Sequence, residues 1–227
     1  MSELLNHYFK LRMDKDPVIP SVNDEPGPVI TISRDYGCPG KKVAEKLTNI
    51  LSSTYTADWT WIDKEVLDKL SKELNLNPSV IDDLSNFTDR KLSDYIALIF
   101  SSDYYPGEKK IKNTMAEIIL SFANKGNTVI LGRAGFLVTK HIKNSFHFKL
   151  TAPFDWRVER ISIKRGISFH EAYKEVMEFK IKREQFLKFY SSDTNTDSHF
   201  DEIYDCSIMT VEEILNKAMK GINKRIT

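Results

Sequence analysis

The sequence predicts a doubly wound α/β fold with a mostly parallel sheet. Short apolar segments that begin near residues 29, 60, 129, 146 and 205 have the composition of strands, and segments with helical spacing separate them. The first strand leads through a glycine-containing loop into a basic helix. Ligands of such sheets bind beyond the carboxyl ends of the strands, so we expect the functional site in loops that directly follow strands.

Length and composition are those of one ordinary globular domain. The chain has 227 residues, of which 41% are hydrophobic and 29% charged, and its net charge is +1. So small a net charge gives no overall attraction to nucleic acid or to a membrane surface, and we expect neither partner. The sequence shows no apolar run of membrane-spanning length, no secretory signal, and no metal or redox spacing of its two cysteines. These features predict a reduced, cytoplasmic protein.

The first 27 residues are expected to form an N-terminal arm and linker. Residues 1–13 have the spacing of a short amphipathic helix, and residues 14–28 contain four prolines, as an extended linker would. The arm either packs on the domain or on a partner subunit, as in a homodimer, or is a partly disordered tail. The domain itself is expected to span residues 28–227.

A strand, a glycine loop and a helix follow one another in PVITISRDYGCPGKKVAEKL, which is the order of a phosphate-binding loop. Gly37 and Gly40 let a phosphate approach the backbone, and the helix start offers N–H groups beside Lys41 and Lys42. The signature G-x-x-x-x-G-K-[ST] is incomplete, since Asp35 stands at its first glycine and Lys42 at its hydroxyl position. An ordinary βα turn with a basic first helical turn is the alternative.

The rest of the chain continues the alternation of strands and helices. Further strands are expected at residues 60–62, 128–131, 146–150 and 204–209. Helices are expected at residues 41–52, 64–74, 79–84, 89–100, 111–124, 136–142, 154–164, 169–190 and 211–223. Ser168 and Glu171 have the pattern of a capping box, and Gly126 and Gly166 stand where helices end.

Polar residues directly follow three of the predicted strands. Asp63, Arg133 and Thr151 occupy these positions. Because the carboxyl ends of parallel strands meet at one edge of a sheet, we expect these residues to converge with the glycine loop. The convergence favours a phosphate site over an ordinary turn, although Asp63 by itself is most simply read as a helix N-cap.

Five motifs in order resemble the cytidylate kinase-like family of P-loop kinases. They are ITISRDYGCPGKKVAEKL, WIDKEVLDKLSKELNL, NTVILGRAG, FHFKLTAPFDWRVERI and IYDCSIMT, and the resemblance runs from residue 28 to the C-terminus. It implies a P-loop kinase fold, with a five-stranded parallel core, a helical nucleoside-monophosphate-binding region and a mobile lid. It also implies phosphoryl transfer from ATP, with Mg²⁺, to a small-molecule nucleotide, with CMP or dCMP as the nominal acceptor.

The resemblance assigns the donor phosphates to the loop after the first strand, through Gly37, Cys38, Pro39, Gly40, Lys41 and Lys42. Aligned with cytidylate kinases, Gly40 stands at the Walker lysine and Lys41 at the Mg²⁺-binding hydroxyl. Lys41 would then supply catalytic charge from a displaced position, and Pro39 removes one N–H donor. Asp63 is a candidate for substrate or Mg²⁺ contact, and no residue is assigned as a metal ligand.

The resemblance assigns the acceptor phosphate to two arginines. Arg133 resembles the arginine that grips this phosphate, and Arg183 resembles the second arginine of an Asp-x-x-Arg pattern. A guanidinium fork suits a phosphate, although a structural salt bridge is the alternative for Arg133. Ala134 and Lys180 stand where the family has aspartates, which leaves cytidine specificity open.

A basic stripe precedes the predicted lid. Arg157, Arg160 and Lys164 share one helical face, and Arg165 is adjacent. The resemblance makes these residues lid cations that close over the transferring phosphate, with Arg160 and Arg165 as catalytic candidates. A solvated helix face paired with acidic neighbours is the alternative.

Two functions therefore stay open. The first is a nucleoside-monophosphate kinase, or a kinase for a related small phosphate acceptor. The second is a non-catalytic nucleotide-binding or regulatory protein that retains the fold, which the degenerate phosphate loop and the replaced aspartates favour. Nucleotide binding without turnover would separate the two.

Overall fold

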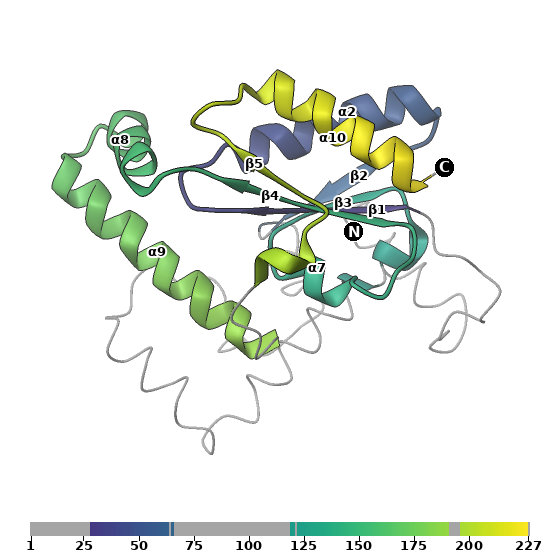
Figure 1. The fold of residues 1–227 in the computed structure, drawn as a ribbon, viewed down its shortest axis with the longest axis horizontal. Helices are drawn as coiled ribbons and strands as arrows, with labels where there is room; N and C mark the ends of the chain where they lie inside the picture. The colour runs from purple at the N-terminus through teal and green to yellow at the C-terminus, as the bar shows by residue number, and fades with distance from the viewer. Residues whose placement is uncertain (1–27, 64, 66–118, 121, 191–195, 227) are drawn as a thin grey trace, which may run out of the picture.

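The computed structural model describes residues 28–63, 65, 119–120, 122–190 and 196–226. Its centre is one parallel sheet with the strand order β2-β3-β1-β4-β5 (Figure 1). The strands are β1 (Val29–Arg34), β2 (Thr60–Ile62), β3 (Thr128–Leu131), β4 (Ser145–Thr151) and β5 (Glu202–Asp205). The predicted doubly wound, five-stranded parallel fold is confirmed.

Strand β1 is the middle of the sheet. Val29 pairs with Thr128 of β3 on one side and with Ser145 of β4 on the other. Five of its six residues are buried, because helices cover both faces. Its carboxyl end at Arg34 is therefore surrounded by the ends of both neighbouring strands.

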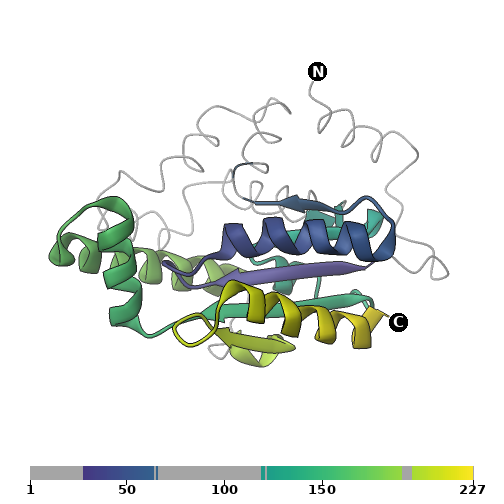
Figure 2. The same ribbon diagram turned by 90° about the horizontal axis from the view of Figure 1, so that it is seen from above.

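One face of the sheet is apolar and is covered by α2 (Gly40–Tyr55) and α10 (Val211–Ile226), which lie side by side over it (Figure 2). Leu47 of α2 and Ile214 of α10 are fully buried in the same cluster as Ile30 and Ile32 of β1. This face fixes α2, and thereby the position at which the loop after β1 must end.

The other face carries a polar layer beneath α7 (Gly135–Val138). Thr31 of β1 and His147 of β4 are paired in register, and the Thr31 hydroxyl lies 2.8 Å from His147 Nδ1. The backbone N–H of His147 donates to a carboxylate oxygen of Asp201 at 2.7 Å, and Ser145 Oγ lies 3.1 Å from His147 Nε2. Burial lowers the pKa of His147 to about 4, so the ring is neutral near pH 7.

Two helices extend beyond the carboxyl end of β4, α8 (Phe154–Arg165) and α9 (Phe169–Tyr190) (Figure 1). Val158 of α8 and Val176 of α9 are buried against each other's helices in one cluster. Gly166 has a φ of 65° and ends α8, as predicted. The predicted capping box is also confirmed, since Ser168 and Glu171 exchange side-chain to backbone hydrogen bonds at 2.9 and 3.3 Å.

Two predicted elements were placed wrongly. The last strand was expected at residues 204–209, but β5 ends at Asp205, because the Asp205 carboxylate accepts the backbone N–H and the hydroxyl of Ser207 and turns the chain. The helix expected at residues 136–142 is only Gly135–Val138, because the Thr139 hydroxyl donates to the Gly135 carbonyl and closes the turn.

Several predictions lie outside the described residues. They concern the N-terminal arm at residues 1–27, the helices at 79–84 and 89–100, and most of those at 64–74 and 111–124. The end of the last of these is described, and Gly126 closes it with a φ of 78°. No helix among the described residues combines the length and the apolar character that crossing a membrane requires.

Candidate functional site

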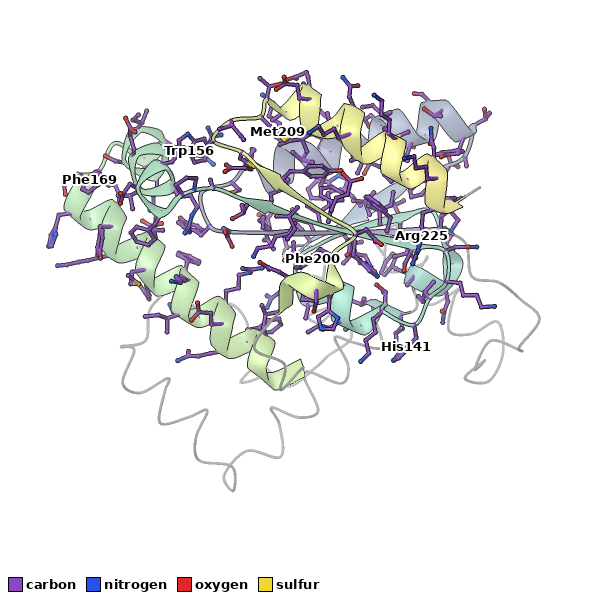
Figure 3. The ribbon with its side chains drawn as sticks, in the orientation of Figure 1. His141, Trp156, Phe169, Phe200, Met209 and Arg225 are labelled. Atoms are coloured by element: carbon purple, nitrogen blue, oxygen red, sulfur yellow. The ribbon has the colours of Figure 1, made fainter. Side chains whose placement is uncertain are left out.

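A cavity of about 900 Å³ opens beyond the carboxyl ends of β1, β3 and β4. Trp156 at the start of α8 and Met209 after β5 lie at this end of the sheet, whereas Arg225 and His141 lie at the opposite end (Figure 3). Among the residues that the structure describes, ten lysines and arginines line the cavity, against three aspartates and glutamates. The chain as a whole has a net charge of only +1, so the cavity concentrates positive charge suited to an anionic ligand.

The loop after β1 uses much of its own hydrogen-bonding capacity. The Cys38 N–H donates to the Asp35 carbonyl at 3.1 Å, and the Gly40 N–H donates to the Cys38 carbonyl at 2.9 Å. The Asp35 N–H donates to Leu150 of β4 at 2.9 Å, and Pro39 has no N–H to offer. The loop is thus compact, and the N–H groups of Asp35, Cys38 and Gly40 face protein acceptors rather than the cavity.

Arg157 of α8 packs against this loop and donates hydrogen bonds to backbone carbonyls in and near it. A Cβ placed on Gly37, whose φ is +100°, would lie 2.9 Å from the Arg157 Cβ. The buried guanidinium donates through Nε to the Ala152 carbonyl at 3.0 Å and through Nη1 to the Tyr36 carbonyl at 3.3 Å. Arg157 therefore spends part of its donor set on the backbone, unlike the other members of the predicted basic stripe.

The two lysines that follow the loop turn away from the cavity. Lys41 is 59% exposed, and its Nζ lies 3.3 Å from a carboxylate oxygen of Glu65 and 4.0 Å from one of Asp63. Neither Lys41 nor the exposed Lys42 lines the cavity. Asp63 is buried at the end of β2, and its carboxylate accepts the Glu65 N–H at 2.9 Å, which is the contact expected of a helix cap.

The turn after β3 holds a strained backbone. Gly132, Arg133 and Ala134 have φ angles of 79°, 53° and 54°, and the Gly135 N–H donates to the Gly132 carbonyl at 2.9 Å. This is the geometry of a type I′ turn, and two of its left-handed residues are not glycine. Such a conformation is costly, and it persists only where the surrounding structure imposes it. It directs Arg133 to the cavity lining, with the guanidinium carbon 5.8 Å from the Phe186 ring.

Arg183 joins α9 to the end of β1. Its Nη1 donates to Asp35 at 2.9 Å and its Nη2 donates to the Ser33 hydroxyl at 2.8 Å. The second Asp35 oxygen accepts a hydrogen bond from the Thr151 hydroxyl at 2.8 Å. Arg183 and Arg133 both line the cavity, so the structure brings the two predicted acceptor arginines together.

Helices α8 and α9 form a hairpin that adds further cations to the cavity lining. Arg160 lines the cavity, and its guanidinium carbon lies 5.3 Å from the Trp156 ring. Arg165 donates to Glu175 at 2.5 Å, and the same carboxylate accepts the Tyr36 hydroxyl. Burial and the bond to Glu175 raise the pKa of Tyr36 to about 12, so its hydroxyl stays protonated. Tyr36 and Arg165 thus tie the loop after β1 to the hairpin.

The sequence reasoning missed Arg34, Ser33 and Asp35 as site residues, although all three line the cavity. Burial, followed by the nearby charges of Arg183 and Arg133, lowers the pKa of Arg34 to about 10, and the Asp63 charge opposes the shift. The signal was present in the motif ISRDYG, since a charged pair directly after an apolar parallel strand falls at the ligand-binding edge.

The described residues contain no group of three histidine, cysteine or acidic side chains that could hold a metal ion. The Asp35 carboxylate, which lines the cavity, already accepts hydrogen bonds from Arg183 and Thr151. A magnesium ion fits this site only when phosphate oxygens supply most of its ligands, which is the usual way in which Mg²⁺ enters sites that act on nucleotides.

A family model described as "Cytidylate kinase-like family" matches residues 29–211, which include every described residue that lines the cavity. Over 131 residues the chain is 28% identical to the cytidylate kinase of Pyrobaculum islandicum, and this match covers 57% of the chain and 68% of that protein. Over 117 residues it is 27% identical to a uronate isomerase of Corynebacterium glutamicum, and this match covers 51% of the chain but 22% of that protein.

A solved structure shares the fold. The crystal structure of an uncharacterized protein from Eubacterium ventriosum matches with a TM-score of 0.63 at 18% identity, covering 87% of this chain and 99% of that one. At this identity the likeness concerns the arrangement of strands and helices and not the chemistry of the cavity.

Proposed function

The chain belongs to the cytidylate kinase-like family, and we propose that it catalyses ATP-dependent phosphoryl transfer, with Mg²⁺, to a nucleoside monophosphate or a related small phosphate acceptor. The observation that carries the proposal is the basic cavity at the carboxyl ends of the strands, with Arg133 and Arg183 on its floor. Phosphoryl transfer requires alignment and charge neutralisation more than covalent help, and a cavity rich in arginine supplies both. The nucleotide substrates are cytoplasmic metabolites, so the proposal places the protein in the cytoplasm.

The residues take distinct parts in this proposal. Arg133 and Arg183 bind the acceptor phosphate, and the loop from Gly37 to Lys42 lies beside the donor phosphates. Arg160 and Arg165 approach from the α8–α9 hairpin and neutralise charge that develops in the transition state. Mg²⁺ would supply further neutralisation of the donor's charge, held mainly by phosphate oxygens, and no general base is needed, because an acceptor phosphate is already ionised.

The acceptor's base is the finer part of the proposal. CMP and dCMP are the nominal acceptors, but Ala134 offers no carboxylate, and Lys180 adds a further cation to the cavity lining. A cytosine amino group needs an acceptor atom, which neither side chain has. We therefore expect weaker discrimination between monophosphates than a site with both carboxylates would give, or an acceptor that carries more negative charge.

A second candidate function rests on one observation. Three of the N–H groups of the loop after β1 have protein acceptors, and Lys41 pairs with Glu65, so the donor side is poorer in donors than a complete phosphate loop. A protein that binds nucleotide without transferring phosphate would show the same features. Its distinguishing property is ATP affinity without turnover.

An assay of ADP release separates the two candidates. The purified protein would be given ATP and Mg²⁺ with CMP, dCMP, UMP, AMP or GMP in turn, and Arg133→Ala would serve as the site variant. Release that depends on the acceptor and is lost in Arg133→Ala establishes the kinase and its substrate class. ATP binding by calorimetry without release for any acceptor removes the monophosphate kinase and leaves the binding protein or another acceptor.

A further inference from the structure

The Arg34 side chain lies in a narrow space beside two glycines, Gly40 and Gly132. Arg34 is the last residue of β1, and its side chain leaves the strand between the start of α2 and the turn after β3. A Cβ placed on Gly40 would lie 3.0 Å from Arg34 Cγ, and one placed on Gly132 would lie 1.8 Å from Arg34 Nη1. Any other residue at Gly132 would collide with the guanidinium, so this conformation of Arg34 depends on the bare backbone beside it.

The guanidinium lies among like charges. Burial lowers the pKa of its guanidinium most, the charges of Arg183 and Arg133 lower it further, and the Asp63 charge opposes them. Arg183 has Asp35 as its own partner at 2.9 Å, whereas no described residue accepts a hydrogen bond from the Arg34 side chain. Three clustered guanidiniums cost folding free energy through repulsion and lost hydration, and a bound polyanion removes that cost.

The location of Arg34 determines which part of a bound polyanion its side chain would contact. On one side is the loop after β1 that leads to α2, and on the other is the turn that carries Arg133. The lysines that a phosphate loop would normally contribute, Lys41 and Lys42, lie outside the cavity. Arg34 is therefore a strand-end cation between the proposed donor side and the proposed acceptor side.

We propose that Arg34 binds the phosphoryl group in transit and supplies the central positive charge that the displaced lysines do not place in the cavity. The inference rests on the proposed function. During transfer an acceptor oxygen forms a bond to the γ-phosphorus while the bond from that phosphorus to the β–γ bridging oxygen breaks, and ADP leaves with the electron pair. The Arg34 N–H groups hold the oxygens of the group being transferred, and the guanidinium keeps its protons throughout.

The kinetic test compares Arg34→Met, Arg34→Lys and the wild type. Arg34→Met is expected to lower kcat by about 100-fold or more, because the contact strengthens in the transition state, and to weaken ATP binding by a smaller factor of about tenfold. Arg34→Lys keeps a charge but loses the forked guanidinium, so an intermediate loss of about tenfold in kcat is expected.

Arg225→Met is the matched control, since Arg225 is exposed at the opposite end of the sheet (Figure 3). A kcat of Arg34→Met within about threefold of the wild type overturns the inference and leaves the proposed function standing.

The binding test needs no turnover. Pyrophosphate affinity is measured by calorimetry, and the melting temperature is measured with and without pyrophosphate. Arg34→Met is expected to weaken pyrophosphate binding about tenfold or more, while its melting temperature without ligand is no lower than that of the wild type, because a repulsive cation is gone. If the wild type transfers no phosphate but this loss of affinity is seen, the proposed function fails and the Arg34 phosphate contact stands. Pyrophosphate affinity equal in Arg34→Met and the wild type, or no pyrophosphate binding by the wild type, overturns the inference. If Arg34→Met does not fold, Arg34→Lys is judged by the same two measurements.

Discussion

Two glycine turns follow neighbouring strands of this sheet, and they place their cations in opposite directions. After β1, the chain turns through Gly37 into α2, and Lys41 points outward to Glu65 at 3.3 Å. After β3, the chain turns through Gly132 in left-handed geometry, and Arg133 lines the cavity. The first turn has its positive φ at a glycine and hydrogen-bonds within itself. The second turn has a positive φ at two residues that are not glycine, and its Arg133 side chain lines the cavity.

The difference shows where the positive charge of the site comes from. In a complete phosphate loop, backbone N–H groups and a helix-start lysine meet the phosphate. Here the strand end at Arg34, the strained turn at Arg133 and the helix α9 at Arg183 provide guanidiniums instead. Under the proposed function, these guanidinium side chains would take over part of the phosphate binding that backbone N–H groups perform in a complete loop.

The largest effect on kcat/KM is expected when the cation of the second turn, Arg133, is removed, and it should exceed the effect of removing Lys41 after the first turn. Arg133→Ala is expected to lower kcat/KM for the acceptor by about 100-fold or more, because a charge-assisted phosphate contact is lost. Lys41→Ala is expected to lower it by less than about tenfold, because Lys41 is exposed and paired outside the cavity. Steady-state kinetics of both variants checks this, and an equal loss in the two would show that Lys41 moves into the site when substrate binds.

Substituting the glycine of the strained turn comes next. Gly132→Ala is expected to cost about 2–4 kcal/mol in the free energy of unfolding, because it adds a collision with Arg34 to an unfavourable positive φ. Gly166→Ala is the matched control, since its φ is +65° but nothing lies within 4 Å of the added methyl, and it should cost about 1 kcal/mol. Urea unfolding measures both, and equal costs would mean that Arg34 moves aside freely.

A smaller effect is expected from loosening the first turn. Arg157→Met removes the donors to the Ala152 and Tyr36 carbonyls and is expected to cost about 2 kcal/mol of stability. Arg160→Met, three residues along the same helix, should change stability by less than about 0.5 kcal/mol, because Arg160 is exposed. Thermal unfolding of the two variants decides whether Arg157 is a structural brace, and similar losses would speak against it.

The smallest effect concerns the ion pair outside the cavity. Glu65→Gln removes the partner of Lys41 and should change the free energy of unfolding by less than about 0.5 kcal/mol and turnover by less than about twofold. A marked rise in turnover would indicate instead that Glu65 holds Lys41 away from the donor phosphates. ADP release measured at low and high salt distinguishes these results, since the pair is screened by salt.

The sequence predicted the sheet well, because its strands are buried on both faces and read as short apolar runs. Residues 60–62 and 128–131 were predicted with their observed ends. The strand at β5 was misplaced because its edge position leaves Ile203 exposed, so hydrophobicity did not mark its limits. The turn at Asp205 that ends it depends on a side-chain hydrogen bond, which apolar patterning does not report.

The site was predicted in part. Arg133 and Arg183 lie in the cavity as expected of acceptor residues, and their assignment to the acceptor stays a prediction. The outward direction of Lys41 could not be read from the sequence, because it depends on how α2 is rotated against the sheet. Arg34 was missed because a strand-end arginine beside an aspartate looks like a solvated pair, and only the bare glycines at 40 and 132 show where its side chain goes.

The buried imidazole of His147 makes the folded protein less stable at acid pH. Its pKa lies near 4 in the folded protein, against 6.5 as the ordinary value, mainly because of burial, with the charge of Asp201 opposing the shift and those of Arg225 and His199 adding to it. Between these values the unfolded chain binds a proton that the folded protein does not, so stability falls as the pH drops from about 6.5 towards 4. The hydrogen bonds between this ring and the Thr31 and Ser145 side chains lie beside the middle and the amino-terminal part of β1, where His147 pairs with Thr31 and Ser145 pairs with Val29. Acidification would therefore loosen the middle of β1, the strand whose last residue is Arg34.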